Sequence, residues 1–234
     1  MIAPHTIKVA LILPTVPVYS VPLFSYLSQA DDVEITCFYS RGGKRGAKSV
    51  GNNLPVPNVM VPALYQPFSG VPLYQCVLKS VITGKFDAVI CCQSLGNLAQ
   101  LILWMLSPIL KYKFLWWGMG FDEYRLESPE SEPKGLLNTI AVRIKDFMWR
   151  RSDALLVYSE QGKRYSLKRN INPHKIFVLN NTLDVEQMRR QAQTIQQVDI
   201  QETRKKIGLS ENSFAFLFLG RLYKQKEVPF LIKA

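Results

Sequence analysis

The sequence predicts an α/β fold with a doubly wound parallel sheet, followed by the beginning of a second domain of the same kind. Three observations lead to this prediction. Short apolar runs of strand length recur along the chain, and helical patterns lie between most of them. After Asp184 the sequence is mostly polar until a last apolar run. Alternating strands and helices are typical of Rossmann-like domains, whose parallel strands are buried on both faces.

Individual elements follow from the apolar periodicity. The predicted strands are Ile7 to Leu13, Val33 to Tyr39, Val59 to Pro62, Ala88 to Cys92, Phe114 to Trp117, Ala154 to Tyr158 and Ile176 to Leu179. The predicted helices are Pro22 to Gln29, Pro72 to Thr83, Leu95 to Leu110, Gly135 to Arg151 and Gln161 to Arg169. Because strand and helix alternate in this order, we expect one doubly wound sheet.

Polarity divides the chain into three parts. Residues 1–184 form the Rossmann-like domain, 185–212 a polar, helical connector, and 213–234 the first strand and helix start of a second Rossmann-like domain. The new strand is Phe214 to Leu219, and the helix begins near Pro229. One strand and half a helix cannot bury their own apolar faces, so we expect this second domain to be incomplete.

The chain is basic, with 29 Lys and Arg against 18 Asp and Glu and a formal net charge of +11. This charge favours nucleic acid, anionic lipid or phosphorylated small molecules as partners. No nucleic-acid-binding module is recognisable, so no nucleic-acid partner is expected. The cysteines form no C-x-x-C pair, which favours buried thiols in a reducing cytoplasm over a metal site.

Several other classes of protein are disfavoured. The sequence contains no G-x-S-x-G elbow, Walker A loop, G-x-G-x-x-G fingerprint, H-E-x-x-H pair or calcium loop, which argues against hydrolase, kinase-like and NAD-dependent activities. We expect no cofactor and no metal. The most apolar stretch, Leu98 to Leu110, is interrupted by Pro108 and is shorter than the roughly 20 residues of a membrane span.

A basic loop after the last strand suits a diphosphate. Gly220 allows close approach of the backbone to an anion, Arg221 can donate two hydrogen bonds to phosphate oxygens, and Lys226 adds a point charge. The position between a strand and a helix is where open α/β sheets bind ligands. The alternative is a solvated basic loop with no ligand.

Three segments in consistent order resemble family 4 (group 1) glycosyltransferases of the GT-B fold. They are Ser152 to Gly162, Ile176 to Asp184 and Phe216 to Ala234. The resemblance implies a retaining enzyme with an N-terminal acceptor domain, cut short in this chain early in its C-terminal donor domain. It also implies that Arg221 and Lys226 contact the diphosphate of a nucleotide-sugar donor.

Candidate acceptor or sugar contacts lie in the first domain, and no catalytic residue is identified. Tyr19 is in a segment similar to a family loop that usually carries Arg where this chain has Ser20. The residues Gly118, Met119 and Gly120 resemble a strand end where many relatives place a His. Met119 cannot transfer a proton, so this loop acts by its shape or is only a turn. Asp122 offers a carboxylate to a sugar hydroxyl, or is an ordinary surface acid.

The helix predicted over Gly135 to Arg151 combines basic and apolar residues. They are Arg143, Lys145, Arg150 and Arg151, with Leu136, Leu137, Ile140, Ile144, Phe147 and Met148. One interpretation is a peripheral membrane face. The commoner arrangement is an apolar stripe packed on the sheet with a basic side in solvent.

These observations predict a hexosyltransferase-like enzyme in polysaccharide, lipopolysaccharide or glycolipid synthesis. It moves a sugar from a nucleotide-sugar donor to a hydroxyl acceptor, which can be lipid-linked. We expect a cytoplasmic protein, with peripheral association at the inner face of the membrane, and we expect residues 1–234 alone to be inactive. The Gly-Arg-Leu-x-x-x-Lys form disfavours a sugar-nucleotide epimerase. The alternative is a non-catalytic Rossmann-like binding or scaffold domain at a membrane surface.

Overall fold

The computed structural model describes residues 6–42, 53–66, 72–94, 96–121, 135–180, 183–210, 213–220, 222 and 226–233. The chain divides into two compact units, Met1–Asp184 and Val185–Ala234, and each is considered by itself below.

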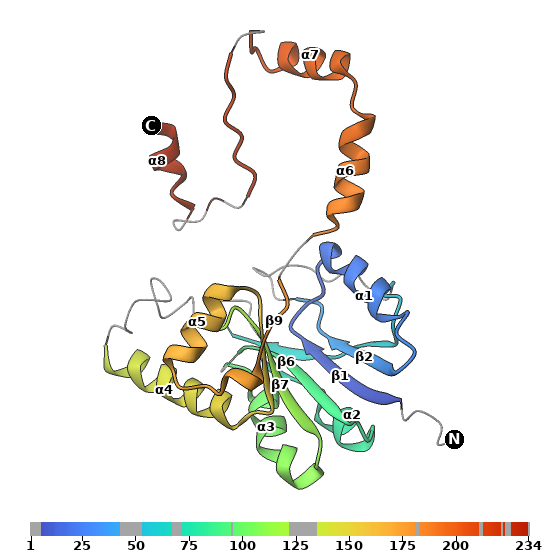
Figure 1. The fold of residues 1–234 in the computed structure, drawn as a ribbon, viewed down its shortest axis with the longest axis vertical. Helices are drawn as coiled ribbons and strands as arrows, with labels where there is room; N and C mark the ends of the chain where they lie inside the picture. The colour runs from blue at the N-terminus through green and yellow to red at the C-terminus, as the bar shows by residue number, and fades with distance from the viewer. Residues whose placement is uncertain are drawn as a thin grey trace. The chain divides into compact units, whose positions relative to one another are not determined.

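The first unit is built on a parallel sheet of seven strands (Figure 1). In chain order the strands are β1 (Ile7–Leu13), β2 (Val33–Tyr39), β3 (Asn58–Met60), β6 (Ala88–Cys92), β7 (Lys113–Gly118), β8 (Ala154–Val157) and β9 (Ile176–Val178). Their order across the sheet is β3-β2-β1-β6-β7-β8-β9, and every pair is parallel. The predicted Rossmann-like fold class is confirmed.

Helices connect the strands of this unit. They are α1 (Val21–Leu27), α2 (Leu78–Thr83), α3 (Leu98–Leu110), α4 (Leu136–Arg151) and α5 (Glu160–Lys168), with 3-10 turns η1 (Val18–Ser20) and η2 (Pro173–Lys175). The ends of α3 have local causes. Asn97 caps its first turn by accepting a hydrogen bond from the Ala99 amide at 3.2 Å, and Lys111 leaves the helix in a left-handed conformation with φ 61°.

One predicted helix is wrong over its first half. The sequence predicts a helix from Pro72 to Thr83, but Pro72–Gln75 is strand β5, which pairs antiparallel with β4 (Ala63–Tyr65). The helix α2 begins only at Leu78. A proline is accepted at the first position of a short strand, and the apolar run before Leu78 fits either structure when periodicity alone is considered. The antiparallel pair was therefore missed.

The core covers both faces of the sheet, because successive strand residues point to opposite sides. Ala10 and Ile12 of β1 pack in one cluster that includes Leu103 of α3. Leu11 packs in the other cluster with Phe24 of α1. Figure 1 shows α3, α4 and α5 beside the strands β6 to β9, and α1 beside β1 and β2. The two clusters hold the strand ends in fixed positions.

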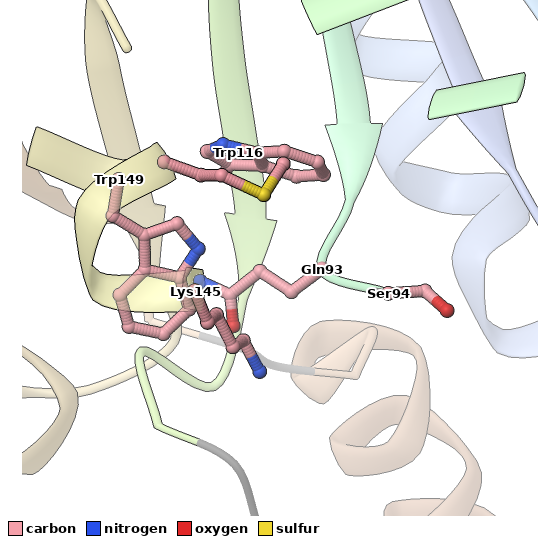
Figure 2. A pocket seen from close by; sticks show the side chains of 6 residues that line it. Gln93, Ser94, Trp116, Lys145 and Trp149 are labelled. Atoms are coloured by element: carbon pink, nitrogen blue, oxygen red, sulfur yellow. The ribbon is translucent and has the colours of Figure 1, made fainter. Parts of the chain in front are cut away.

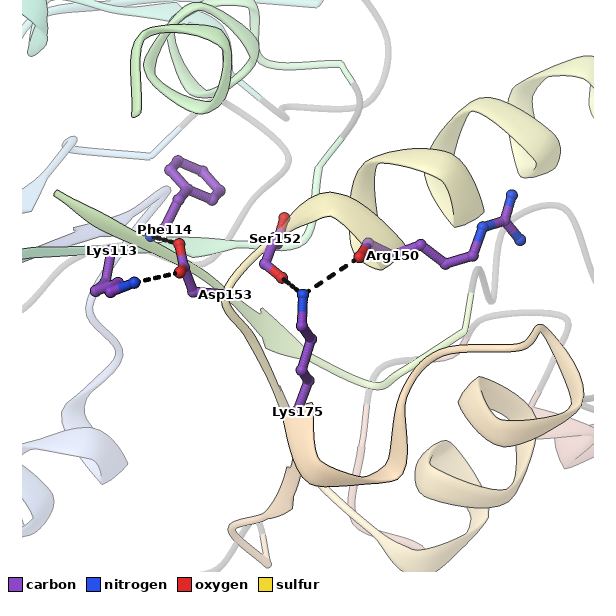
Figure 3. A network of polar contacts seen from close by, with 6 residues as sticks. All are labelled: Lys113, Phe114, Arg150, Ser152, Asp153 and Lys175. Atoms are coloured by element: carbon purple, nitrogen blue, oxygen red, sulfur yellow. Dashed lines mark hydrogen bonds and ion pairs between the residues drawn. The ribbon is translucent and has the colours of Figure 1, made fainter. Parts of the chain in front are cut away.

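Polar contacts fix the strand entrances at the amino-terminal edge of the sheet (Figure 3). The Asp153 carboxylate accepts a hydrogen bond from the Phe114 amide at 2.9 Å and contacts the Lys113 ammonium at 3.0 Å. Lys175 Nζ donates to the Ser152 carbonyl at 2.9 Å. Asp153 is therefore a structural residue at a strand entrance, as its position before an apolar run indicates, and not a base in a site.

The second unit contains the helices α6 (Val185–Thr194), α7 (Gln197–Lys206) and α8 (Val228–Lys233). The predicted strand from Phe214 to Leu219 is not formed, since residues 213–219 carry no helix or strand. Phe214 and Phe216 are each 82% exposed. A parallel strand needs neighbours to accept its hydrogen bonds, and no other strand occurs in the described part of this unit.

Candidate functional site

The carboxyl-terminal edge of the sheet is where a ligand site is expected. β1 pairs with β2 on one side and with β6 on the other, so the direction of winding reverses between β1 and β6. In open parallel sheets ligands bind in the crevice outside the carboxyl ends of the strands at this reversal. The residues that follow β1, β2, β6 and β7 therefore define the candidate site.

A buried network of polar side chains joins three of these strand ends. Gln75 Nε2 donates to the carbonyl of Leu13, the last residue of β1, and to Oγ of Ser40, which follows β2, each at 2.9 Å. Asn97, which follows β6, donates through Nδ2 to Gln75 Oε1 at 2.7 Å. Ser40, Gln75 and Asn97 are all buried. The network joins the ends of β1 and β2 to the start of α3, whose first turn is capped by the same Asn97.

Sequence reasoning did not identify this network. Ser40 directly follows the predicted strand Val33 to Tyr39, and a polar residue in that place is a recognisable signal for a strand-end site. Gln75 and Asn97 carried no such signal, because both lie within segments that were predicted as helices. Its buried amide is required by the structure, since each of the three partners it joins would otherwise lose a hydrogen bond inside the protein.

The loop after β7 has a packing reason for both of its glycines. The Gly120 amide donates to Gln93 Oε1 at 3.1 Å, and a Cβ at Gly118 would lie 2.8 Å from the same oxygen. Gly120 has φ +85°, and a Cβ there would lie 2.8 Å from the Cα of Gly162 in α5. The predicted contacts of Gly118, Met119 and Gly120 with an acceptor stay a prediction, with Met119 half-buried.

A small pocket lies beside this loop (Figure 2). It is lined by Gln93, Ser94, Trp116, Lys145, Met148 and Trp149. Lys145 is buried, and its ammonium lies 4.9 Å from the centre of the Trp149 ring. Among the described residues, Gln93 Nε2 and Trp116 Nε1 have no hydrogen-bond acceptor. Both atoms are buried donors beside the loop after β7.

The thiols near the site are neutral and unsuited to nucleophilic attack. Burial raises the pKa of Cys92, at the end of β6, to about 11, although the positive charge of Lys145 lowers it in part. Burial also raises the pKa of Cys37 to about 12. Because the thiolate is the reactive form of cysteine, these side chains serve the core.

The other predicted site residues are placed as follows. Tyr19 lies in η1, between β1 and α1, and its side chain is exposed. Gly220 and Lys226 are exposed residues of the second unit. Arg221 and Asp122 lie outside the described residues. The diphosphate contacts predicted for Gly220, Arg221 and Lys226, and the acceptor contacts of Tyr19 and Asp122, stay predictions.

No cluster of three or more His, Cys, Asp or Glu side chains arranged to hold a metal ion occurs in the described part of the chain. His174 is exposed in η2. Among the helices that the structure describes, none is both long and apolar enough to pass through a lipid bilayer.

Comparison with solved structures finds a similar fold in a protein whose structures contain UDP, glucose or UDP-glucose. HepE from Anabaena, in complex with UDP and glucose, matches with a TM-score of 0.58 at 15% identity, covering 97% of this chain and 57% of that one. HepE with UDP-glucose matches with a TM-score of 0.50 at 14% identity over 88% of this chain and 50% of that one. The comparison supports a GT-B-type fold.

UDP-GlcNAc 2-epimerase from Neisseria meningitidis, bound to UDP-GlcNAc, also matches, with a TM-score of 0.47 at 15% identity over 88% of this chain and 55% of that one. The likeness is too low to argue from. No protein-family profile and no curated protein sequence matches the chain. The chain spans about half the length of the structures it matches.

Proposed function

We propose that the protein, in its full-length form, is a glycosyltransferase that moves a sugar from a nucleotide-sugar donor to a hydroxyl acceptor. The donor is a UDP-sugar. The products belong to polysaccharide, lipopolysaccharide or glycolipid synthesis, and the acceptor is lipid-linked. More specifically, we propose a retaining, hexosyltransferase-like enzyme of family 4 that acts in the cytoplasm at the inner face of the membrane.

The observation that carries this proposal is the fold match to HepE bound to UDP and glucose, which extends over 97% of the chain. At 15% identity it speaks for the fold alone. The chemical argument for the ligand comes from the loop that begins at Gly220. There Arg221 and Lys226 supply the positive charges that a diphosphate needs. The fold match and the basic loop together support the proposal, the first by architecture and the second by charge.

The two basic side chains would act on the leaving group. When the bond between the sugar and the diphosphate breaks, negative charge grows on the departing phosphate oxygen. A guanidinium and an ammonium held near that oxygen bind the transition state more strongly than the intact donor, which lowers the barrier without a metal ion. Gly220 leaves room for the phosphate to approach the backbone.

The acceptor would lie at the carboxyl edge of the first unit. Tyr19 follows β1, and the loop of Gly118, Met119 and Gly120 follows β7. The buried amides of Gln75 and Asn97 hold this edge rigid, and a rigid floor positions a hydroxyl for attack. Asp122 would contact a sugar hydroxyl from the same loop.

A non-catalytic scaffold domain is the competing function, and one observation favours it. Met119 stands where many members of the resembling family have a His, and a thioether cannot transfer a proton. A scaffold would keep the fold and the basic surface without binding the donor. Titration with a nucleotide separates the two functions.

The test is calorimetric titration of UDP into the longest natural form of the protein. The variant Arg221→Ala with Lys226→Ala removes the two diphosphate contacts. Lys205→Ala with Lys233→Ala is the matched control, because it removes two exposed positive charges of the same unit outside the loop. We expect micromolar binding that is lost in the first variant and kept in the control. A folded protein that binds no UDP, or equal loss in both variants, would overturn the proposal.

A further inference from the structure

The helix α4 leaves much of its apolar stripe exposed to solvent. Its buried residues are Val142, Lys145, Asp146, Met148 and Trp149. Leu136 and Leu137 are 75% and 82% exposed, while Ile140, Ile144 and Phe147 are between 45% and 50% exposed. The commoner arrangement, with the apolar stripe on the sheet, is therefore wrong for this helix apart from Met148.

The buried side of α4 explains this orientation. Trp149 and Met148 pack in the core cluster of the sheet, and the Lys145 ammonium lies over the Trp149 ring. Asp146 contacts the Arg169 guanidinium at 3.8 Å. A rotation that buried the apolar stripe would remove Trp149 from the core and separate this ion pair, so the exposed stripe is a fixed feature of the fold.

The exposed stripe is continuous along the helix. Leu136, Ile140, Ile144 and Phe147 are separated by four, four and three residues, the spacing that places side chains on one helical face. Isolated exposed apolar residues are ordinary on protein surfaces, whereas a contiguous apolar face marks an interaction site. We call this set the outer face of α4.

Within α4, the exposed charged residues beside the outer face are all positive. Arg143, Arg150 and Arg151 are exposed, and the Arg151 guanidinium lies 4.8 Å from the centre of the Phe147 ring. The single acidic residue of α4, Asp146, is buried on the other side. The face is therefore apolar along its centre and cationic at its margin.

The neighbouring helix α3 extends this surface. Trp104 of α3 meets Phe147 edge to face, with ring centres 6.2 Å apart. Met105 and Ile109 of α3 are each more than half exposed. The contact fixes Phe147 at the border of the two helices.

We propose that the outer face of α4 docks the protein on an anionic lipid bilayer. Leucine, isoleucine and phenylalanine side chains enter the boundary between headgroups and acyl chains, and arginines at the margin pair with lipid phosphates. A second copy of the chain fits poorly, because Arg143, Arg150 and Arg151 of the two copies would repel each other. The inference deepens the proposed function because it names the membrane as a partner. It rests on the proposed function only for the reason that the protein docks there.

The test is co-sedimentation of the full chain with vesicles of equimolar phosphatidylglycerol and phosphatidylcholine, and with vesicles of phosphatidylcholine alone. One variant, Ile144→Ser with Phe147→Ser, removes apolar insertion, and another, Arg143→Gln with Arg151→Gln, removes charge. The matched control is Leu64→Ser with Ile82→Ser, which changes exposed apolar residues of β4 and α2. Circular dichroism checks that every variant is folded.

We expect binding to the anionic vesicles that weakens about 25-fold in each α4 variant, from about fivefold for each of the two side chains, and that is unchanged in the control. Binding should also fall as NaCl is raised. The proposal is overturned if folded wild-type protein does not bind the anionic vesicles, or if the control loses as much binding as the α4 variants. It is also overturned if the α4 variants bind vesicles as the wild type does but no longer form a dimer of the chain in solution. UDP titration of the same variants is independent, so a failure here leaves the donor site standing.

Discussion

Replacing Gln75 by Leu tests whether the buried amide network holds the candidate crevice together. Leu has a similar size, so the substitution removes hydrogen bonds without opening a large cavity. Three contacts disappear, to the Leu13 carbonyl at 2.9 Å, to Ser40 Oγ at 2.9 Å and from Asn97 Nδ2 at 2.7 Å. At about 1 kcal/mol for each hydrogen bond, the free energy of unfolding should fall by about 3 kcal/mol.

Urea unfolding followed by tryptophan fluorescence measures this change. All four tryptophans lie within residues 1–184, so the signal reports on the first unit, and the slope with urea should stay constant. Gln29→Leu, an exposed glutamine of the same unit, is the control and should change stability by less than about 0.5 kcal/mol. A loss below about 1 kcal/mol for Gln75→Leu would refute the network as a structural element.

The remaining predictions concern the β7 loop and the thiols. Gly120→Ala should destabilise the protein by more than Gly135→Ala in urea unfolding, because both glycines have φ +85° but only Gly120 has neighbours that a Cβ would meet; equal losses would show that strain alone matters. Iodoacetamide at pH 8 should label Cys76, which is exposed, while Cys37 and Cys92 react only in urea. Burial raises the pKa of Cys37 from 9.0 to about 12 and that of Cys92 from 9.0 to about 11. The stability that comes from their protonated forms is therefore present below pH 9 and should be lost as the pH rises toward 12. A free energy of unfolding that stays constant over this range would contradict the prediction.

Strong local patterns made most of the sheet predictable. Three strands, Ile7–Leu13, Val33–Tyr39 and Ala88–Cys92, begin and end where the apolar runs do, because a strand buried on both faces requires an unbroken run. The antiparallel pair of β4 and β5 was missed, since three- and four-residue strands give too short a pattern to distinguish from a helix.

The orientation of α4 could not be read from its sequence. Its periodicity offers an apolar stripe at Leu136, Ile140, Ile144 and Phe147, but the structure buries the side with Trp149 instead. Which side of α4 faces the sheet depends on how its side chains fit the core and on the ion pair of Asp146 with Arg169. These two residues are 23 positions apart along the chain, so the periodicity of the helix does not predict their contact. The same holds for the strand expected at residues 213–219, which needs partner strands to form.

Candidate site residues were identified where they belong to a recognisable motif. They were missed where residues far apart in the sequence meet only in the fold. The Gly118 to Gly120 loop was recognised from its resemblance to a strand-end segment of the glycosyltransferase family, yet its packing against Gly162 emerged only from the structure. Gln75 and Asn97 are 22 residues apart and meet because β5 packs against α3. Distances of this kind are set by topology and not by local pattern.

Saturation-transfer NMR of UDP-glucose with the longest natural form of the protein tests the central claim most directly. The account predicts transfer to both uridine and glucose protons, and its loss in the variant Arg221→Ala with Lys226→Ala. A folded protein that shows no transfer to either group, while still binding anionic vesicles through α4, would contradict the glycosyltransferase assignment and identify a membrane-docked scaffold instead.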